Sequence, residues 1–274
     1  MIGICTDSNS QLPASLAQRY GIEAVPLTVT VDGAEYMEGI ALDADAFYAK
    51  YTAGRRPAVS TSQPSPGQFA VAYDDLLARG CTEILSIHVS GAMSGTPNAA
   101  RLAAHSLPTP ARLVDSGTAS FGISCCVWAA AAAIADGATL DQAAQIAEQL
   151  APSIGNVFVV GALDHLHAGG RGTGLAHGDD LAMLTLRDGN VEVVERLATA
   201  LDAVNAMASY AIGWGTTVRV AVGHSDAATQ PLADGLEAAV GEAASVIDVV
   251  RYRVGPSVGA HTGPGTVGCF VFPA

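Results

Sequence analysis

The sequence predicts an α/β protein with two parts. An N-terminal domain over residues 1–154 is expected to hold a doubly wound, mainly parallel sheet, and residues 155–274 are expected to form an α+β domain. Strand-like apolar runs alternate with helix-like segments up to about residue 152, which is typical of parallel sheets. From Asn156 onward a hairpin pattern enters, and half of all residues are hydrophobic, enough for a sizeable core.

The N-terminal elements follow from apolar runs, caps and turn residues. Asp32-Gly33 is a hairpin signal, and Thr139 with Gln142 forms a capping box that predicts the start of a helix. We expect strands or strand material at 1–5, 22–31, 83–89 and 111–114, and helices at about 12–20, 44–51, 68–77, 99–104, 120–135 and 140–150.

The C-terminal pattern mixes a hairpin with βαβ material. Strands are predicted at 157–160, 181–186, 191–194, 217–222, 246–253 and 267–272, with helices at about 198–214 and 227–240. Asp188-Gly189 is the turn signal of the hairpin. This part is therefore expected to hold an antiparallel or mixed sheet.

Composition excludes several classes of function. The formal net charge is −13, with one lysine and twelve arginines, which argues against binding to nucleic acid or to an anionic membrane surface. No apolar run is long enough for a spanning helix, so stable membrane insertion is not expected. A P-loop Gly-Lys-Ser/Thr is absent. The five cysteines form no CxxC pair, which favours reduced core thiols and a cytoplasmic location.

Residues 90–97 (SGAMSGTP) carry the strongest local signal for a site. They connect a predicted buried strand to a predicted helix, for which Thr96 is a natural N-cap and Pro97 a suitable first residue. Unpaired N–H groups at a helix start attract anions, and Gly91 and Gly95 permit close approach. An ordinary capped turn remains the alternative at this point.

Other hydroxyl and acidic clusters follow predicted strands or precede helices. They are Asp7-Ser8, Thr61 with Ser62, and Asp115-Ser116. Ligands of doubly wound sheets bind beyond the carboxyl ends of the strands, so these clusters and Ser94 are expected to share one site.

Two arginines and a histidine could supply positive charge to an anion. Arg171 follows Gly169-Gly170, and its guanidinium fork suits a carboxylate or phosphate; Arg196 follows the hairpin. His261 is expected on a small-residue turn. The pair His165 and His167 lacks suitably spaced partners, so no metal is predicted. The GxGxxG match at 263–268 is rejected as a dinucleotide site because no helix follows it.

Six short motifs in order resemble the DegV family of fatty-acid-binding proteins over nearly the whole chain. They are TDS near residue 7, TSQPSP at 61–66, SGT at 94–96, DS at 115–116, GGR at 169–171 and HTGPG at 261–265. The resemblance implies a long-chain fatty acid between two α/β domains, with its tail in an apolar tunnel. It implies carboxylate contacts from Thr61, Ser94, His261 and Arg171, with Ser62, Gly95, Thr96 and Arg196 as additional candidates.

The resemblance also implies a division of labour. The protein would present the fatty acid to a separate fatty acid kinase that makes acyl-phosphate, and would itself have no catalytic residue, cofactor or metal. The chain departs from the family pattern at Gly91, Pro97 and Gly172, and has Thr185-Leu186-Arg187 in place of a usual Lys-Pro. These departures concern the surface that would dock the kinase and the preference for a particular acyl chain.

Two enzymatic alternatives stay open from the residues. The first is a serine hydrolase or esterase that uses Ser94, His261 and an acid such as Asp115 or Asp7, since a triad is defined by geometry rather than by order. Against it, the chain has no GxSxG elbow. The second is a sugar- or phosphate-processing enzyme, which the missing nucleotide motif disfavours.

Overall fold

The N-terminal part of the chain forms a parallel four-stranded sheet. The computed structural model describes residues 1–52, 55–161, 181–187 and 189–274. The strand order is β2-β1-β6-β7, and every neighbouring pair is parallel. The strands are β1 (Ile2–Asp7), β2 (Glu23–Val25), β6 (Glu83–His88) and β7 (Ala111–Asp115). The predicted doubly wound sheet is confirmed.

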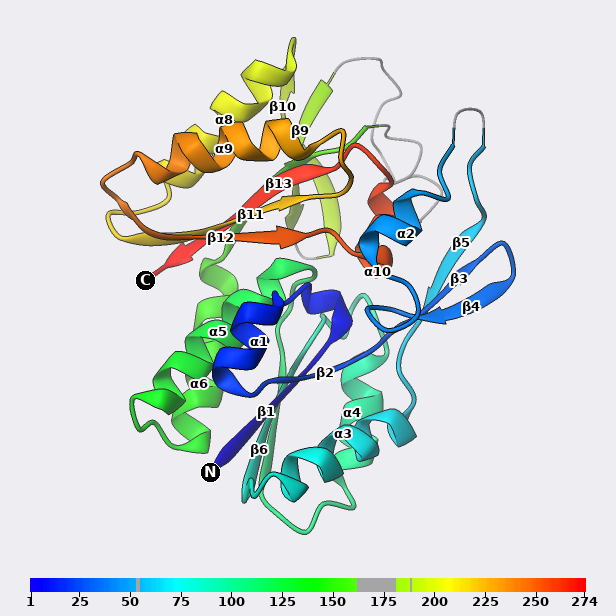
Figure 1. Ribbon diagram of the computed structural model, residues 1–274. Coiled ribbons are helices and arrows are strands. Elements are labelled where there is room, and N and C mark those ends of the chain that lie inside the picture. Colours follow the sequence, from blue (N-terminus) through cyan, green and yellow to red (C-terminus); the bar gives the residue numbers. More distant parts are fainter. Residues whose placement is uncertain (53–54, 162–180, 188) are drawn as a thin grey trace.

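Helices cover both faces of this sheet (Figure 1). On one face lie α3 (Pro66–Ala78) and α4 (Thr96–Ala104), packed on Cys5 and Ile84. On the other lie α5 (Phe121–Ala135) and α6 (Leu140–Leu150), packed on Leu85 and Ile87; α1 (Ala14–Tyr20) precedes β2. Neighbouring β6 residues therefore place their side chains in two cores, one on each face of the sheet, because side chains alternate between the faces of a strand. The predicted capping box of Thr139 and Gln142 is present.

The C-terminal part forms a mixed six-stranded sheet in the order β10-β9-β8-β13-β11-β12. Only β11 and β12 are parallel among the pairings described; the others are antiparallel. The elements are β8 (Gly155–Val159), β9 (Leu181–Arg187), β10 (Asn190–Leu197), α8 (Ala200–Ile212), β11 (Val218–His224), α9 (Gln230–Gly241), β12 (Val246–Arg253) and β13 (Val267–Pro273). Helices α8 and α9 pack on one face, which matches the expected α+β class (Figure 1).

Helix α5 lies between the two sheets and joins their cores. Its sequence is apolar all round, so it cannot expose a face to water without cost. Ile123 and Val127 pack on the parallel sheet, while Phe121 and Trp128 pack on the mixed sheet. The Phe121 and Tyr252 rings lie 4.6 Å apart, centroid to centroid. Because β8 begins at Gly155, the predicted division at 154/155 stays a reasonable proposal for the domain boundary.

Two elements near the junction were not predicted. Residues 59–62 form β5 (Val59–Ser62), which joins β3 (Thr28–Val31) and β4 (Ala34–Met37) in a small antiparallel sheet. His261 lies in a helix, α10 (Pro256–Thr262), rather than on a turn. Helix α10 lies beside α2 (Ala44–Tyr48), between the two larger sheets (Figure 1).

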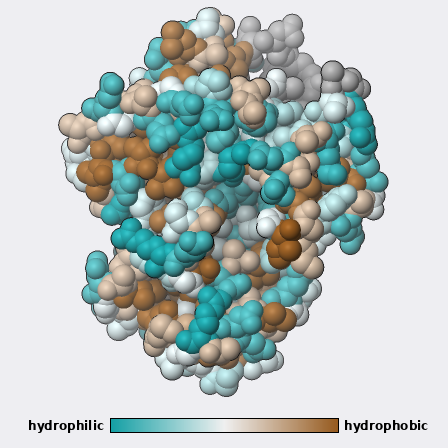
Figure 2. Space-filling model, viewed as in Figure 1, coloured by the Kyte–Doolittle hydropathy of each residue, from teal (hydrophilic) through white to brown (hydrophobic). Residues whose placement is uncertain are grey.

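The surface view shows no single dominant apolar area on the face drawn. Hydrophobic residues there occur in separate groups among hydrophilic ones (Figure 2). Within the described ranges, no helix combines the length and the apolar character needed to cross a bilayer.

Candidate functional site: a cavity between the two sheets

A cavity of about 600 Å³ lies where α10, β5 and the loop after β6 meet the mixed sheet. This volume is in the usual range for small-molecule sites. The lining is of two kinds. Hydroxyl, amide and imidazole groups come mainly from the N-terminal part and α10: Asn9, Thr61, Ser62, Gln63, Ser94, Ser120, Ser257, His261, Thr262 and Thr266. Apolar side chains come mainly from the sheets: Val89, Val157, Phe158, Leu186, Val191, Val254, Cys269 and Phe270.

The structure brings most of the predicted residues to this one cavity. Thr61 and Ser62 of β5, Ser94 and Gly95 of the loop after β6, and His261 of α10 all line it. They come from positions as far as 200 residues apart in the chain. These residues therefore surround one cavity, while their contact with a ligand carboxylate stays a prediction.

Three predicted candidates are placed differently or lie outside the described ranges. Thr96 is fully buried and does not line the cavity, and Arg196 is exposed on β10. Arg171 lies outside the described residues, as do His165 and His167. Among the residues that are described, no group of three His, Cys, Asp or Glu side chains could hold a metal ion.

Ser94 is held by a compact loop just before α4. The Ser94 N–H donates to the Ser90 carbonyl at 3.0 Å, and the Ser94 and Thr96 hydroxyls lie 2.8 Å apart. Gly95, not Thr96, is the N-cap residue of α4, which corrects the prediction. A side chain at Gly95 would overlap the Gln63 amide, so the segment that follows β5 lies in close contact with the loop that carries Ser94.

Asp7 and Asp115 hold backbone and do not line the cavity. The Asp115 carboxylate accepts from the N–H groups of Gly91 at 3.0 Å and Gly117 at 2.9 Å. The Asp7 carboxylate accepts from Asn9 and Val89, each at 3.1 Å. Both acids thus bond the backbone at the start of the segment that carries Ser94. The expectation that they belong to the ligand site is wrong for their side chains.

The hydrogen bonds described for Asp7, Asp115 and Ser94 do not assemble the Ser94–His261–acid triad of the hydrolase alternative. The described hydrogen bonds of Asp7 and Asp115 go to other groups, and the Ser94 hydroxyl bonds to Thr96. A general base needs hydrogen-bond contact with its nucleophile and an acid that orients it. The geometry therefore gives the hydrolase hypothesis no support.

A different chain of triad-type residues occurs nearby, inside the protein. Ser86 Oγ lies 2.6 Å from His88 Nε2, and His88 Nδ1 lies 3.0 Å from Asp7 Oδ2. The Tyr73 hydroxyl lies 2.9 Å from Ser86 Oγ and is the last member of this series of hydrogen bonds. All four side chains are at most 1% exposed, so no substrate reaches Ser86. The chain is a buried polar network that joins β1 to β6.

Several lining residues were missed from the sequence, and Asn156 is the clearest case. Its side-chain amide bonds the backbone of Leu186 twice, at 2.9 Å to the carbonyl and 2.8 Å to the N–H. The register between β8 and β9 is given by one pair, Phe158 with Leu184, so Asn156 supplies strand-like bonds beyond it. An isolated Asn in a strand pattern carries no sequence signal for this role.

The cysteine side chains are buried and form no disulfide with one another. All five are free, and Cys269 lines the cavity. Burial raises the pKa of Cys269 to about 12, so almost none of it is thiolate near neutral pH.

We expect iodoacetamide at about pH 8 to label the native protein far more slowly than the urea-unfolded chain. Fast labelling of native Cys269, read by peptide mass spectrometry, would contradict this.

Glu38, which follows β4, is a buried acid beside α10. Burial raises its pKa above the ordinary glutamate value, although donation from the Ser257 N–H and the Ser8 hydroxyl lowers it. A raised folded-state pKa means that the stabilisation from protonating Glu38 is fully present below the unfolded pKa. That stabilisation is lost as the pH rises through the folded pKa.

This sign gives a testable pH dependence. The glutamine of Glu38→Gln cannot ionise. The free energy of unfolding of this variant should therefore rise relative to that of the wild type as the pH increases from about 4 to about 8. Urea unfolding of both proteins over this range measures the difference. Parallel curves would show that the raised pKa has no effect on stability.

The fold and the site together define a class of protein. Two α/β parts enclose a cavity with a polar cluster and an apolar wall, a lining that suits an amphipathic small molecule. The DegV family model, described as "Uncharacterised protein, DegV family", matches residues 1–274. The chain belongs to the DegV family.

Relatives and solved structures agree with this assignment. The chain is 38% identical to a DegV domain-containing protein of Streptomyces coelicolor over 280 residues, 98% of each chain. A structure from Thermus thermophilus, described as "Fatty Acid Binding of a DegV family Protein", has a TM-score of 0.86 and 30% identity and covers 100% of this chain and 99% of its own. A Thermotoga maritima structure, said to reveal "fatty acid binding function", matches at 25% identity with a TM-score of 0.86 and covers 100% and 99%.

Proposed function

We propose that this protein binds one long-chain fatty acid in the cavity between its sheets. The carboxylate would bond to Thr61, Ser94, His261 and Arg171, with Ser62 and Gly95 as further contacts. The observation that carries the proposal is the divided lining, in which hydroxyl and imidazole groups gather in a cavity otherwise walled by apolar side chains. The fatty acid named for the Thermus thermophilus relative, at 30% identity, supports the same ligand.

The energetics favour this ligand class. Burying an acyl chain contributes about 0.8 kcal/mol for each CH₂, so a long chain gives roughly 10 kcal/mol before the costs of binding. Few polar contacts are then needed to fix the headgroup. A short polar anion would leave the apolar wall unused.

A titration with matched ligands tests the proposal. Delipidated protein should bind oleic acid more tightly than oleyl alcohol, because only the acid carries a carboxylate, and should bind octanoic acid much more weakly, because less chain is buried. Tryptophan fluorescence or calorimetry would follow the binding. No binding of any long-chain acid would refute the proposal.

We further propose that the loaded protein presents its fatty acid to a separate fatty acid kinase in the cytoplasm. The protein would supply the buried acyl group, and the kinase would supply ATP. Mixing loaded protein, the kinase catalytic protein and ATP should give acyl-phosphate, which hydroxylamine traps as the hydroxamate. Product from this protein and ATP alone would instead make it an enzyme.

A further inference from the structure

The start of α10 is tied to the N-terminal domain by a cluster of buried hydrogen bonds. Gln11 accepts from the Gly255 N–H, and Asn9 Nδ2 donates to Ser257 Oγ at 3.2 Å. Glu38 Oε1 accepts from the Ser257 N–H at 2.7 Å. These bonds cross from the segment after β1 and from the end of β4 to a helix more than 200 residues later.

Glu38 is the centre of this cluster and is only 6% exposed. Its second oxygen, Oε2, lies 2.5 Å from the hydroxyl of Ser8, which in turn accepts from the Leu27 N–H at 2.9 Å. Both carboxylate oxygens are therefore engaged. A buried carboxyl is costly unless it is hydrogen-bonded, and a nonpolar residue would leave the Ser257 N–H without its acceptor.

His261 follows Ser257 by four residues, one turn of the same helix. Helix α10 has seven residues, too few to be stable without tertiary contacts. Its position therefore depends on what holds it, and a shift at Ser257 is passed on to His261.

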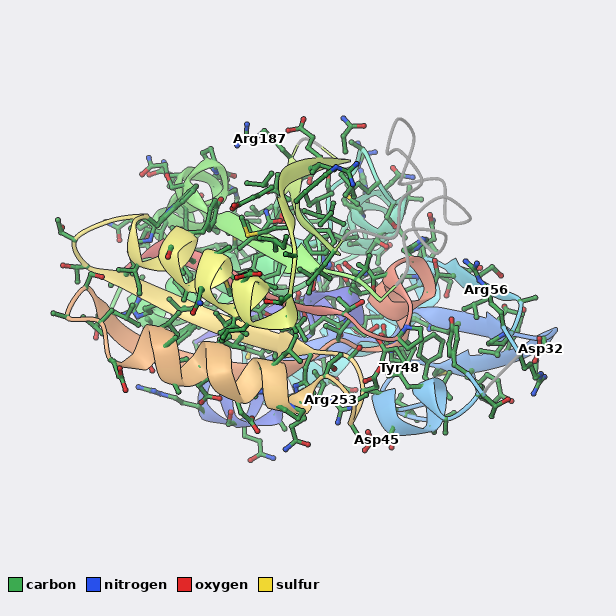
Figure 3. The ribbon with its side chains drawn as sticks, turned by 90° about the horizontal axis from the view of Figure 1, so that it is seen from above. Asp32, Asp45, Tyr48, Arg56, Arg187 and Arg253 are labelled. Atoms are coloured by element: carbon green, nitrogen blue, oxygen red, sulfur yellow. The ribbon has the colours of Figure 1, made fainter. Side chains whose placement is uncertain are left out.

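Contacts with α2 limit α10 on another side. A Cβ at Gly259 would overlap the Tyr48 hydroxyl, and Arg253 Nη2 pairs with Asp45 Oδ1 at 2.7 Å. Figure 3 shows Asp45, Tyr48 and Arg253 close together where α2 meets the end of β12. The α2 contacts are packing and an exposed ion pair, whereas Glu38 provides a directed bond to the α10 backbone.

We propose that Glu38 is a positioning residue that fixes α10, so that His261 faces the ligand carboxylate beside Thr61 and Ser94. Glu38 does not line the cavity, and its effect on the ligand passes through the Ser257 backbone. This inference rests on the proposed fatty-acid binding. It assigns to the end of β4 and to the Asp7-Ser8 motif a part in headgroup recognition that the motif comparison did not give them.

The test compares ligands with and without a carboxylate. Glu38→Ala should weaken oleic acid binding by at least about tenfold, because the His261 contact is displaced, and oleyl alcohol binding by less than about threefold. Glu38→Gln keeps an acceptor for the Ser257 N–H and an amide that can donate to Ser8, so it should stay within about threefold of wild type for both ligands. Exposed Glu35 on β4, changed to alanine, is the matched control and should change neither.

A second variant keeps the positioning role testable if Glu38→Ala does not fold. Glu38→Asp keeps the charge but is one methylene shorter, so it withdraws the acceptor from Ser257 and should also weaken oleic acid selectively. Combined with His261→Ala, Glu38→Asp should add less than about twofold, because both changes remove the same contact.

The outcomes separate this inference from the proposed function. Wild-type protein that binds no long-chain acid overturns both. If wild type binds, then equal losses for acid and alcohol, or unchanged acid binding in Glu38→Ala and Glu38→Asp, overturn the positioning role alone. A selective loss of acid binding that Glu38→Gln restores supports it.

Discussion

Replacing Asp7 with alanine is expected to lower the free energy of unfolding by about 3–5 kcal/mol. The carboxylate is fully buried and bonds His88 Nδ1 at 3.0 Å and the N–H groups of Asn9 and Val89. Its loss leaves three donors without an acceptor in the protein interior, and two of them are backbone N–H groups that lie just after β1 and β6. For a chain of this length, the midpoint of thermal unfolding should fall by roughly 6–15 °C.

Asp115→Ala is the matched control for Asp7→Ala. Asp115 ends the nearby strand β7 and also accepts from two backbone N–H groups, but it is exposed, so water can replace it. We expect its loss to lower the free energy of unfolding by about 1 kcal/mol. Chemical unfolding of both variants measures the difference. If both variants lost the same free energy of unfolding, burial of the Asp7–His88–Ser86 network would not be the cause of the larger loss expected for Asp7→Ala.

Changing Ser94 and His261 together to alanine is expected to weaken oleic acid binding by about a hundredfold or more. A hydrogen bond to a charged group contributes about 1.5–3 kcal/mol, and each variant removes one such contact with the carboxylate. Oleyl alcohol lacks the charge and keeps the apolar wall of the cavity, so its affinity should change by less than about threefold.

The control for this pair is Ser60→Ala. Ser60 lies on β5 beside Thr61 but is exposed and does not line the cavity, so its loss should leave both affinities unchanged. Circular dichroism would confirm that the variants remain folded. If the double variant bound oleic acid as tightly as the wild type, Ser94 and His261 would not be headgroup contacts.

The regular elements were predictable because they carry their own local signals. The mostly apolar segment 120–135 predicted a helix, the Thr139–Gln142 capping box predicted the start of α6, and the alternation of strands and helices predicted the parallel sheet. Each of these signals depends on neighbours within a few residues. The family resemblance used short motifs in order, and the match over residues 1–274 agrees with it.

The elements that form the cavity were harder to predict because distant contacts make them. Strand β5 (Val59–Ser62) exists through pairing with β3, about 30 residues earlier, and its Ser and Thr residues read as a loop. Helix α10 contains a glycine and β-branched residues and is held by Glu38, Asn9 and Gln11. Thr61 and His261 were therefore found as residue types in motifs, while the elements that position them were missed.

The side chains of Asp7 and Asp115 show a further limit of sequence reasoning. Their places at strand ends suggested ligand contacts, yet both carboxylates accept from backbone N–H groups instead. A strand-end carboxylate can serve either purpose, and the sequence does not distinguish them. The difference lies in which N–H groups the following loop turns toward the acid.

The most direct test of fatty-acid binding is mass spectrometry of small molecules extracted from protein purified under native conditions. The account predicts one long-chain fatty acid at nearly one molecule per chain, and its loss from the Ser94→Ala, His261→Ala double variant. Protein that carries no lipid, and that no long-chain fatty acid stabilises in a thermal-shift series, would contradict the account.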